Sequence, residues 1–270
     1  MKVVPILMYH SISPKASRKF RPFALSPELF GAHLAYLYEN SYTPLSVSQW
    51  ATALQGGTSQ LPARPVVITF DDGFLDFYHA ALPVLLKYGF PATLFIVTGC
   101  VEESSHWLKS EGEMNRKMLK WSHILEIDQA GIECGAHTHR HADLDIVSPN
   151  MVRKEITLSK EILEQKLGHA VATFSYPYGH YDQRVRDVVE QSAFQAACAV
   201  RNALSHIKDH RFSLARITIN NRTSVQQLAA LLNGKGLSLA KEGEALTTKT
   251  WREFRRFYHA LNSQTTRTSL

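Results

Sequence analysis

Cysteine is scarce in this sequence, and long apolar runs are missing. The 270 residues include 3 cysteines, Cys100, Cys134 and Cys198, which lie far apart and form no CxxC pair. An odd number of scattered cysteines argues against a disulfide framework, so we predict reduced and buried thiols. The apolar run of residues 3–8 is too short for the core of a signal sequence or for a membrane span of about 20 residues. We therefore expect a cytoplasmic protein, provided that no leader precedes this sequence.

Dense charge of one sign is also missing. The 30 Lys and Arg residues outnumber the 24 Asp and Glu residues, giving a net charge of +6 that is spread thinly along the chain. Without a dense basic stripe or a recognition motif, the sequence argues against nucleic acid as a partner. Apolar residues make up 44% of the chain, which excludes disorder as its main state. A chain of this length can form one large domain, since single α/β barrels commonly run to about 250 residues.

Short apolar runs alternate with helical patterns along the chain, which predicts an α/β fold with a parallel sheet. One helix is expected to begin at Ser26-Pro27, and another to run from Ser148-Pro149 to a left-handed cap at Gly168. The predicted strands are Val3 to Met8, Val66 to Phe70, Ala92 to Val97, Ile132 to Ala136, Thr173 to Tyr176, Ala196 to Val200 and Ile217 to Ile219.

Two regions break this pattern. Between Gly99 and Lys120 we predict an irregular insertion that could form part of a rim over the site. We expect residues 1–233 to form the domain and residues 234–270 to form a C-terminal tail, helical and docked on it. The tail carries aromatic residues among arginines, so contact with a membrane surface or a partner is the alternative. These tail residues are Trp251, Arg252, Phe254, Arg255, Arg256, Phe257 and Tyr258.

Two adjacent carboxylates, Asp71 and Asp72, follow the apolar strand predicted at residues 66–70, and Gly73 comes next. In α/β folds the carboxyl ends of parallel strands line the ligand site, so these acids are expected to face a pocket. A divalent cation can compensate one of two neighbouring acids while the other stays free to accept a proton. An ordinary Asp-Asp-Gly turn with solvated acids is the alternative.

A histidine cluster follows another predicted strand, at residues 132–136. His137 and His141 have a spacing that a tight loop can fold onto one cation, although histidines also cluster on surfaces. A third strand ends in Tyr176-Pro177-Tyr178-Gly179, a turn that can aim a backbone N–H and an aromatic wall into a pocket or can be an ordinary loop.

In this order, the three clusters resemble the first three signature motifs of the polysaccharide deacetylase family, also known as the NodB-homology group or carbohydrate esterase family four. The similarity extends over roughly residues 1–233. The resemblance implies an α/β fold of the distorted (β/α)7-type barrel kind. It also implies a hydrolase that removes N-acetyl or O-acetyl groups from a sugar and depends on a metal.

The resemblance also implies roles for individual residues. Asp71 resembles the general base, and Asp72, His137 and His141 resemble the ligands of one divalent ion, usually zinc, with cobalt or nickel as alternatives. Tyr178 resembles the residue whose backbone N–H holds the oxyanion. The same motif places its neighbours Pro177 and Gly179 at the substrate site.

The sequence departs from the family pattern at two positions. Most members carry a late Leu-x-His motif, yet the only histidine after Arg216 is His259. One subgroup, similar to the deacetylases of poly-N-acetylglucosamine export, has the corresponding strand at its N-terminus, so we predict His10 as the general acid; a histidine hydrogen-bonded beneath a loop is the alternative. Ser175 stands where many members have an arginine that orients the base, and we predict that Arg216 reaches the same carboxylate and borders the substrate site.

These observations lead us to expect a deacetylase that acts on an N-acetylhexosamine of a polysaccharide or glycolipid precursor. One alternative is a deformylase or esterase that uses the same ion and base on another acylated sugar. Another is a glycan-binding protein with weak catalysis, because the motif arginine is missing. Tyr181 and Trp107 could stack on a pyranose ring or could simply pack, while His139, Arg140 and Asp182 are expected mainly in loops.

Overall fold

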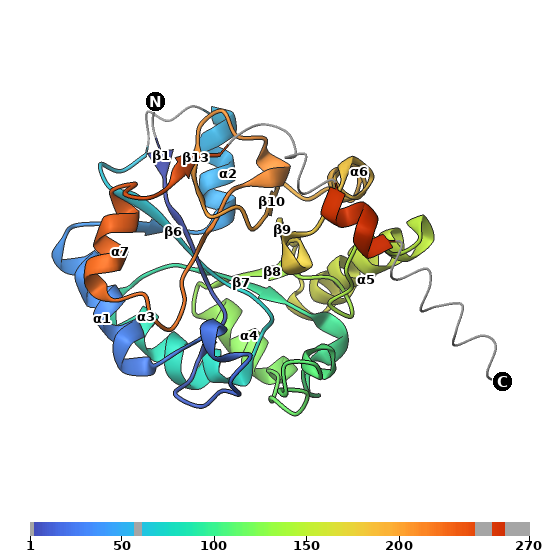
Figure 1. The fold of residues 1–270 in the computed structure, drawn as a ribbon, viewed down its shortest axis with the longest axis horizontal. Coiled ribbons are helices and arrows are strands. Elements are labelled where there is room, and N and C mark those ends of the chain that lie inside the picture. Colours follow the sequence, from blue (N-terminus) through green and yellow to red (C-terminus); the bar gives the residue numbers. More distant parts are fainter. Residues whose placement is uncertain (1–2, 57–60, 241–249, 257–270) are drawn as a thin grey trace.

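The computed structural model describes residues 3–56, 61–240 and 250–256. Parallel strands converge at the centre of the molecule, and helices surround them (Figure 1). In spatial order the main strands are β10 (Ala196–Cys198), β9 (Thr173–Ser175), β8 (Glu133–Ala136), β7 (Thr93–Ile96), β6 (Pro65–Phe70), β2 (Ile6–Tyr9) and β12 (Ile217–Thr218). β5 (Thr43–Leu45) pairs with the first half of β6.

The sheet curves round until its two edges meet. Leu214, just before β12, forms a parallel bridge with Cys198 of β10, and β12 itself pairs with β2. β2, the first strand of the ring in the sequence, therefore lies between β6 and β12. This arrangement confirms the predicted α/β fold with a distorted barrel.

Seven labelled helices follow or connect these strands, in addition to the helix at residues 250–256 described below. They are α1 (Pro27–Glu39), α2 (Val47–Gly56), α3 (Leu82–Tyr88), α4 (Trp121–Gln129), α5 (Pro149–Leu167), α6 (Gln183–Gln191) and α7 (Val225–Leu232). The predicted caps are confirmed: the side chain of Ser26 accepts a hydrogen bond from the Leu29 N–H, and that of Ser148 accepts one from the Met151 N–H. Gly168 ends α5 with φ 77°.

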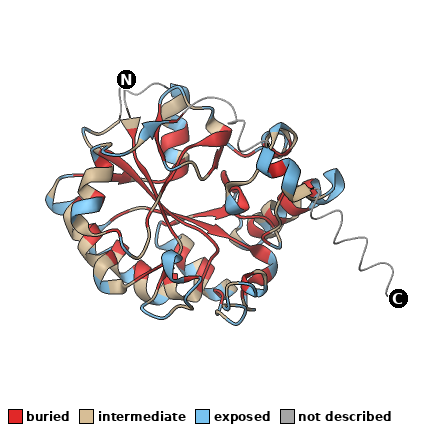
Figure 2. Ribbon diagram, viewed as in Figure 1, coloured by how far each residue is buried: buried red, intermediate tan, exposed pale blue. Residues whose placement is uncertain are grey.

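The central strands are buried along most of their length, and helices surround them (Figure 2). All six residues of β6 and all four residues of β2 are buried. This explains why these strands are continuous apolar runs rather than alternating patterns. Polar residues follow the carboxyl ends of β2, β6 and β8, where His10, Asp71 and His137 stand, and these ends carry the candidate site.

The structure corrects the first predicted strand. Pro5 divides residues 3–9 into β1 (Val3–Val4), which pairs antiparallel with β11 (Ala203–His206), and β2, which pairs parallel with β6. Five short strands were not predicted: β3 (Ser11–Ile12), β4 (Ala24–Leu25), β5, β11 and β13 (Ser238–Leu239). Runs of two to four residues are too short to show a period.

The predicted insertion over residues 99–120 is confirmed as irregular. It contains 3-10 turns at Thr98–Cys100 and His106–Leu108 and is held by a bridge between Ser104 and Lys117. In the tail, residues 250–256 form a helix that lies beside α5 and α6 (Figure 1), while Phe257, Tyr258 and His259 lie outside the described residues. Among the described residues, no helix is long and apolar enough to cross a membrane.

Candidate active site

Adjacent carboxylates at the end of β6 serve two different sets of partners. Asp71 continues the strand, since its N–H donates to the Tyr9 carbonyl at 3.0 Å. Asp72 then adopts φ 80°, a left-handed conformation that is uncommon for residues other than glycine. The chain turns at this point, so that Asp71 contacts Arg216 while Asp72 contacts the histidines. Both acids are buried, at 3% and 4% exposure.

Asp72, His137 and His141 converge as predicted. The Asp72 Oδ1 atom lies 3.5 Å from His137 Nε2 and 3.2 Å from His141 Nε2, and the three ligand atoms lie within 4.8 Å of one another. Although Asp72 Oδ1 is buried, it has no hydrogen-bond partner with acceptable geometry among the described residues. Two imidazoles and a carboxylate form a donor set that suits zinc and similar divalent ions. These residues therefore fit the metal that the family resemblance implies.

The orientation of His137 also fits a metal ligand. Its Nδ1 lies 2.7 Å from the Ser175 carbonyl oxygen, which can only accept a hydrogen bond. Nδ1 therefore carries a proton, and Nε2, which faces Asp72 and His141, is the ring nitrogen available to a metal. Metal-binding histidines are commonly fixed in this way through their second nitrogen.

Aromatic packing holds His141. Its ring stacks on Trp107 at a centroid distance of 4.8 Å and an interplanar angle of 19°, and it meets the edge of Tyr178 at 4.6 Å. Trp107 is thus a packing partner of a candidate ligand, which leaves it less free to act as the sugar platform proposed from the sequence. Tyr181 is packed too, because it stacks on Tyr176 at 4.3 Å and its hydroxyl accepts from Arg201.

The loop between the two histidines is anchored by Glu155 of α5. This carboxylate is 3% exposed and accepts hydrogen bonds from the backbone N–H groups of His139 and Arg140, at 3.0 and 2.7 Å. The predicted loop positions of His139 and Arg140 are confirmed. Glu155 was not predicted from the sequence, although a glutamate within the apolar stripe of a helix is a signal that could have indicated it.

Arg216 forms a fork with Asp71. Its Nη1 donates to Asp71 Oδ1 at 2.6 Å and its Nη2 to Oδ2 at 2.7 Å, while Nη2 also donates to the Ser175 hydroxyl at 2.9 Å. The predicted contact is therefore present. Arg216 has no exposed surface, so the prediction that it binds substrate is wrong: its whole guanidinium is enclosed behind the carboxylate.

Electrostatics keep both carboxyl groups ionised. Burial alone would raise the pKa of Asp71, but the Arg216 guanidinium, together with His137 and His10, lowers it below the ordinary value. Burial likewise opposes ionisation of Asp72, yet His137 and His141 hold its pKa well below the ordinary value. Asp71 Oδ1 accepts one hydrogen bond and Oδ2 accepts two, from Arg216 and from Ser175 at 3.3 Å. Oδ1 therefore retains a lone pair that can accept a proton.

His10 follows β2 at the same edge of the sheet. Its ring meets the edge of Phe23 at 5.1 Å, and its buried Nδ1 has no hydrogen-bond partner in the described part of the chain. Burial lowers the pKa of His10, whereas the nearby charges of Asp72 and Asp71 act to raise it.

The Pro-Tyr-Gly turn follows β9. The Gly179 N–H donates to the Tyr176 carbonyl at 2.9 Å, and Tyr178 has φ 59° and ψ 0°, which is the conformation glycine usually takes at the third position of a type II turn. Tyr178 is 49% exposed, whereas Pro177 is buried. A Cβ atom on Gly179 would lie 2.6 Å from Val200 Cβ, so this position requires glycine. Tyr178 is thus the member of the turn with a side chain available to a ligand, and Pro177 and Gly179 shape the backbone.

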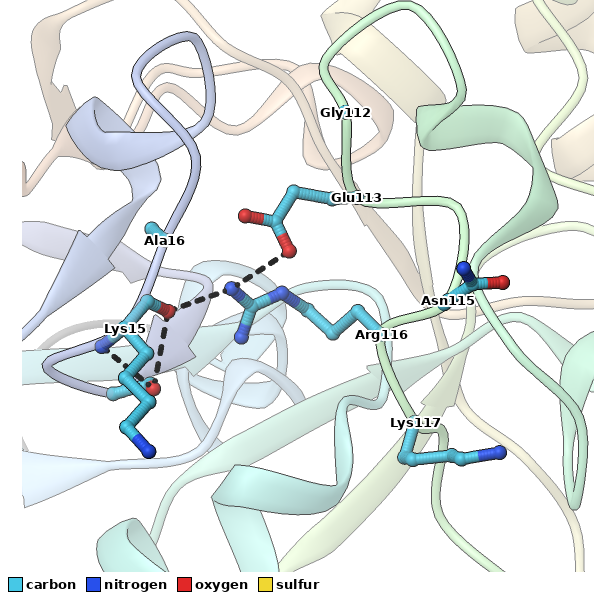
Figure 3. A pocket seen from close by; sticks show the side chains of 8 residues that line it. Lys15, Ala16, Gly112, Glu113, Asn115, Arg116 and Lys117 are labelled. Atoms are coloured by element: carbon cyan, nitrogen blue, oxygen red, sulfur yellow. Dashed lines mark hydrogen bonds and ion pairs between the residues drawn. The ribbon is translucent and has the colours of Figure 1, made fainter.

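A cavity of about 580 Å³ lies between residues 13–16 and residues 112–117. Figure 3 shows Arg116 reaching from the insertion toward the Lys15 carbonyl, to which it donates at 2.9 Å, and toward Glu113 at 3.1 Å. Arg116 also donates to the hydroxyl of Ser11, the residue after His10, at 3.1 Å. The insertion is thereby tied to the strand end that carries His10, which makes it part of the rim of the site.

The ring of parallel strands and the Asp-His-His cluster at its carboxyl edge match the fold and the motif positions that the resemblance to polysaccharide deacetylases implies. A model of the polysaccharide deacetylase family matches residues 58–197, and the chain belongs to this family.

The Bacillus subtilis protein YxkH is 28% identical over 217 residues, which are 80% of this chain and 71% of the relative. The poly-beta-1,6-N-acetyl-D-glucosamine N-deacetylase of Staphylococcus aureus is 25% identical over 219 residues, 76% of this chain and 71% of the relative. The structure of the Streptococcus pyogenes deacetylase PplD, in complex with acetate, superposes with a TM-score of 0.74 at 27% identity, covering 86% of this chain and 98% of PplD.

Proposed function

We propose that this protein removes acetyl groups from N-acetylhexosamine units of a glycan and that it depends on a divalent ion held by Asp72, His137 and His141. The observation that carries the proposal is the convergence of three ligand atoms within 4.8 Å beside Asp71, a buried carboxylate that Arg216 keeps ionised. Membership of the family supports deacetylation, and the name of the S. aureus relative supports a poly-N-acetylglucosamine as the class of substrate.

A bound divalent ion would supply Lewis acidity, which makes a water molecule more acidic and polarises an acetamide carbonyl. Asp71 accepts the proton of the attacking water through Oδ1, whose remaining lone pair is not used by Arg216. Arg216 fixes the plane of this carboxylate by its two parallel hydrogen bonds.

Two further residues act on the acyl group and the leaving group. The backbone N–H of Tyr178 donates to the oxyanion that forms when the carbonyl is attacked. His10 donates a proton to the departing amine, so that the sugar leaves as a neutral amine and acetate is released. The buried Nδ1 of His10 has no hydrogen-bond partner among the described residues, so no described residue competes for its proton.

The test is acetate release by the purified protein from chitooligosaccharides, poly-N-acetylglucosamine fragments, and nucleotide- or lipid-linked sugars. Removal of metal by a chelator is expected to abolish turnover, and zinc, cobalt or nickel is expected to restore it. Asp71→Asn should lower kcat by roughly 10²- to 10⁴-fold, the usual contribution of a general base, while the protein still binds metal.

Asp187→Asn, on α6, is the matched control and should leave turnover unchanged, because its side chain contacts Gln183 and lies outside the site. Formate release in place of acetate would favour the deformylase alternative. Glycan binding without product, in a protein that binds no metal, would refute the proposal in favour of a binding protein. The predicted contact with a membrane surface and the cytoplasmic location remain predictions, to be tested by fractionation of cells.

A further inference from the structure

The helix at residues 250–256 docks on the two loops that carry candidate catalytic residues. Arg255 and Arg256 contact the loop after His141, and both also reach the segment after Tyr178. Arg252 lies against the same segment, with its Nη1 3.4 Å from the Tyr181 carbonyl. The tail therefore bridges elements that follow two different strands of the barrel, β8 and β9.

Arg255 forms the centre of this bridge. Its Nη1 donates to Asp143 Oδ2 at 2.6 Å and lies 2.8 Å from His180 Nδ1, and its Nη2 donates to Asp145 Oδ2 at 2.7 Å. His180 Nδ1 also lies 3.0 Å from Asp143 Oδ1. One guanidinium thus links Asp143, two residues after His141, to His180, two residues after Tyr178.

Charge explains why arginine is needed at this place. Asp145 is 2% exposed and Asp143 is half-buried, so two neighbouring carboxylates have limited access to water. Burial raises the pKa of Asp145, whereas the neighbouring His180 and the Arg255 guanidinium lower the pKa of Asp143 despite its burial. Arg256 adds a second cation, donating to the Asp145 carbonyl and to Asp182 Oδ2, each at 2.7 Å. The cationic side of the helix therefore faces the domain, while Trp251 and Phe254 are exposed.

The two linked loops need external support. His141 and Tyr178 have φ values of 56° and 59°, a left-handed backbone conformation that residues with a side chain rarely adopt. The rings of these residues also pack on each other at 4.6 Å, so a shift of either loop would move the other. Fixing Asp143 and His180 to one guanidinium limits such shifts.

We propose that Arg255 is a positioning residue, which holds the metal ligand His141 and the oxyanion residue Tyr178 in register by joining their loops. Asp143, Asp145 and His180 also have the donor set of a second cation site, with ligand atoms within 4.8 Å of one another. The guanidinium of Arg255 lies among these donors and supplies the positive charge. The proposal rests on the proposed function for the roles of His141 and Tyr178.

The first measurement is zinc affinity, obtained by competition with a chromogenic chelator on the full chain without substrate. Arg255→Ala is expected to weaken zinc binding by roughly 10- to 100-fold, as is typical when groups that orient a metal ligand are removed. Arg255→Lys should lie between this variant and the native protein, because it keeps the charge but loses the fork. Millimolar methylguanidinium should restore affinity to Arg255→Ala. The control is Glu253→Gln, on the same helix, whose carboxylate is 65% exposed and contacts only tail arginines in the described chain; its zinc affinity should be native.

The second measurement is a comparison of kcat and KM for acetate release. Arg255→Ala should lower kcat with little change in KM, since the tail contacts the loops of the reacting groups. Native zinc affinity and native kcat in Arg255→Ala would overturn the proposal. A second zinc bound per chain in Arg255→Ala would also overturn it, because this would show that Arg255 masks a cation site. Because zinc affinity needs no substrate, weakened binding in Arg255→Ala supports the positioning role even if the native protein releases no acetate. Absence of acetate release by the native protein would count against the proposed function alone.

Discussion

The Asp71–Arg216 pair offers a direct test of the energetics of the candidate site. Arg216 is fully buried and Asp71 is 3% exposed, and the two are joined by hydrogen bonds of 2.6 and 2.7 Å. Arg216→Met would leave a buried carboxylate without its cation, and Asp71→Asn would leave a buried guanidinium without its anion. Removing one partner of such a pair typically costs about 3–5 kcal/mol of unfolding free energy.

The double variant separates this penalty from simple loss of contacts. In Asp71→Asn with Arg216→Met neither charge remains buried, so the double variant should be more stable than the sum of the two single losses predicts. We expect a coupling free energy of about 2–4 kcal/mol, because most of each single loss comes from the charge left behind. The measurement is urea-induced unfolding at pH 7 in the presence of a metal chelator. Fluorescence and circular dichroism both follow the transition, to check that it is two-state.

A matched exposed pair provides the control. Arg211 lies 3.7 Å from Glu190, and the two side chains are 41% and 47% exposed. The corresponding Arg211→Met and Glu190→Gln variants should each change the unfolding free energy by less than about 1 kcal/mol, since exposed ion pairs contribute little. The reasoning is refuted if the buried and exposed cycles give the same coupling, or if the two losses at the buried pair simply add.

Three further predictions concern the rim and the turn. Gly179→Ala should lower the midpoint of thermal unfolding and acetate release, because the backbone is left-handed and a Cβ would meet Val200 at 2.6 Å; native values for both would contradict this. Trp107→Ala should weaken zinc affinity by roughly tenfold by removing the stacking partner of His141, whereas Trp107→Phe should keep most of it, and equal losses would argue against stacking. His10→Gln should lower kcat by roughly 10²-fold or more on amides and much less on aryl acetates, whose leaving groups need no proton; equal effects on both would exclude His10 as the acid.

The sequence allowed prediction of the parts of the site that are local in the chain. Asp71 and Asp72 are adjacent, and His137 and His141 lie in one loop, so each cluster could be seen at the end of an apolar run. The barrel was also predictable, because its central strands are long enough to appear as continuous buried segments. The family resemblance then supplied the order of the motifs and the roles that they imply.

Contacts between distant segments were much harder to predict. Arg216 was expected near Asp71, but its complete burial, which rules out contact with substrate, depends on how β12 closes the ring. The link from Arg255 to Asp143 joins residues 112 positions apart, and the sequence near either residue gives no sign of the other. Pro5 was an overlooked signal, since a residue without an N–H can mark the point where a strand changes partners.

The closure of the barrel has a consequence for how the protein is made. Ribosomes synthesise β2, β6 and the loop of His137 and His141 long before β12, so an incomplete chain that ends before Arg216 already contains all three candidate metal ligands. This incomplete chain lacks Arg216, the cation that balances Asp71, and β2 still has an open edge where β12 will pair. The Asp71–Arg216 pair therefore forms late in translation, when β12 pairs with β2, a strand made near the start of synthesis.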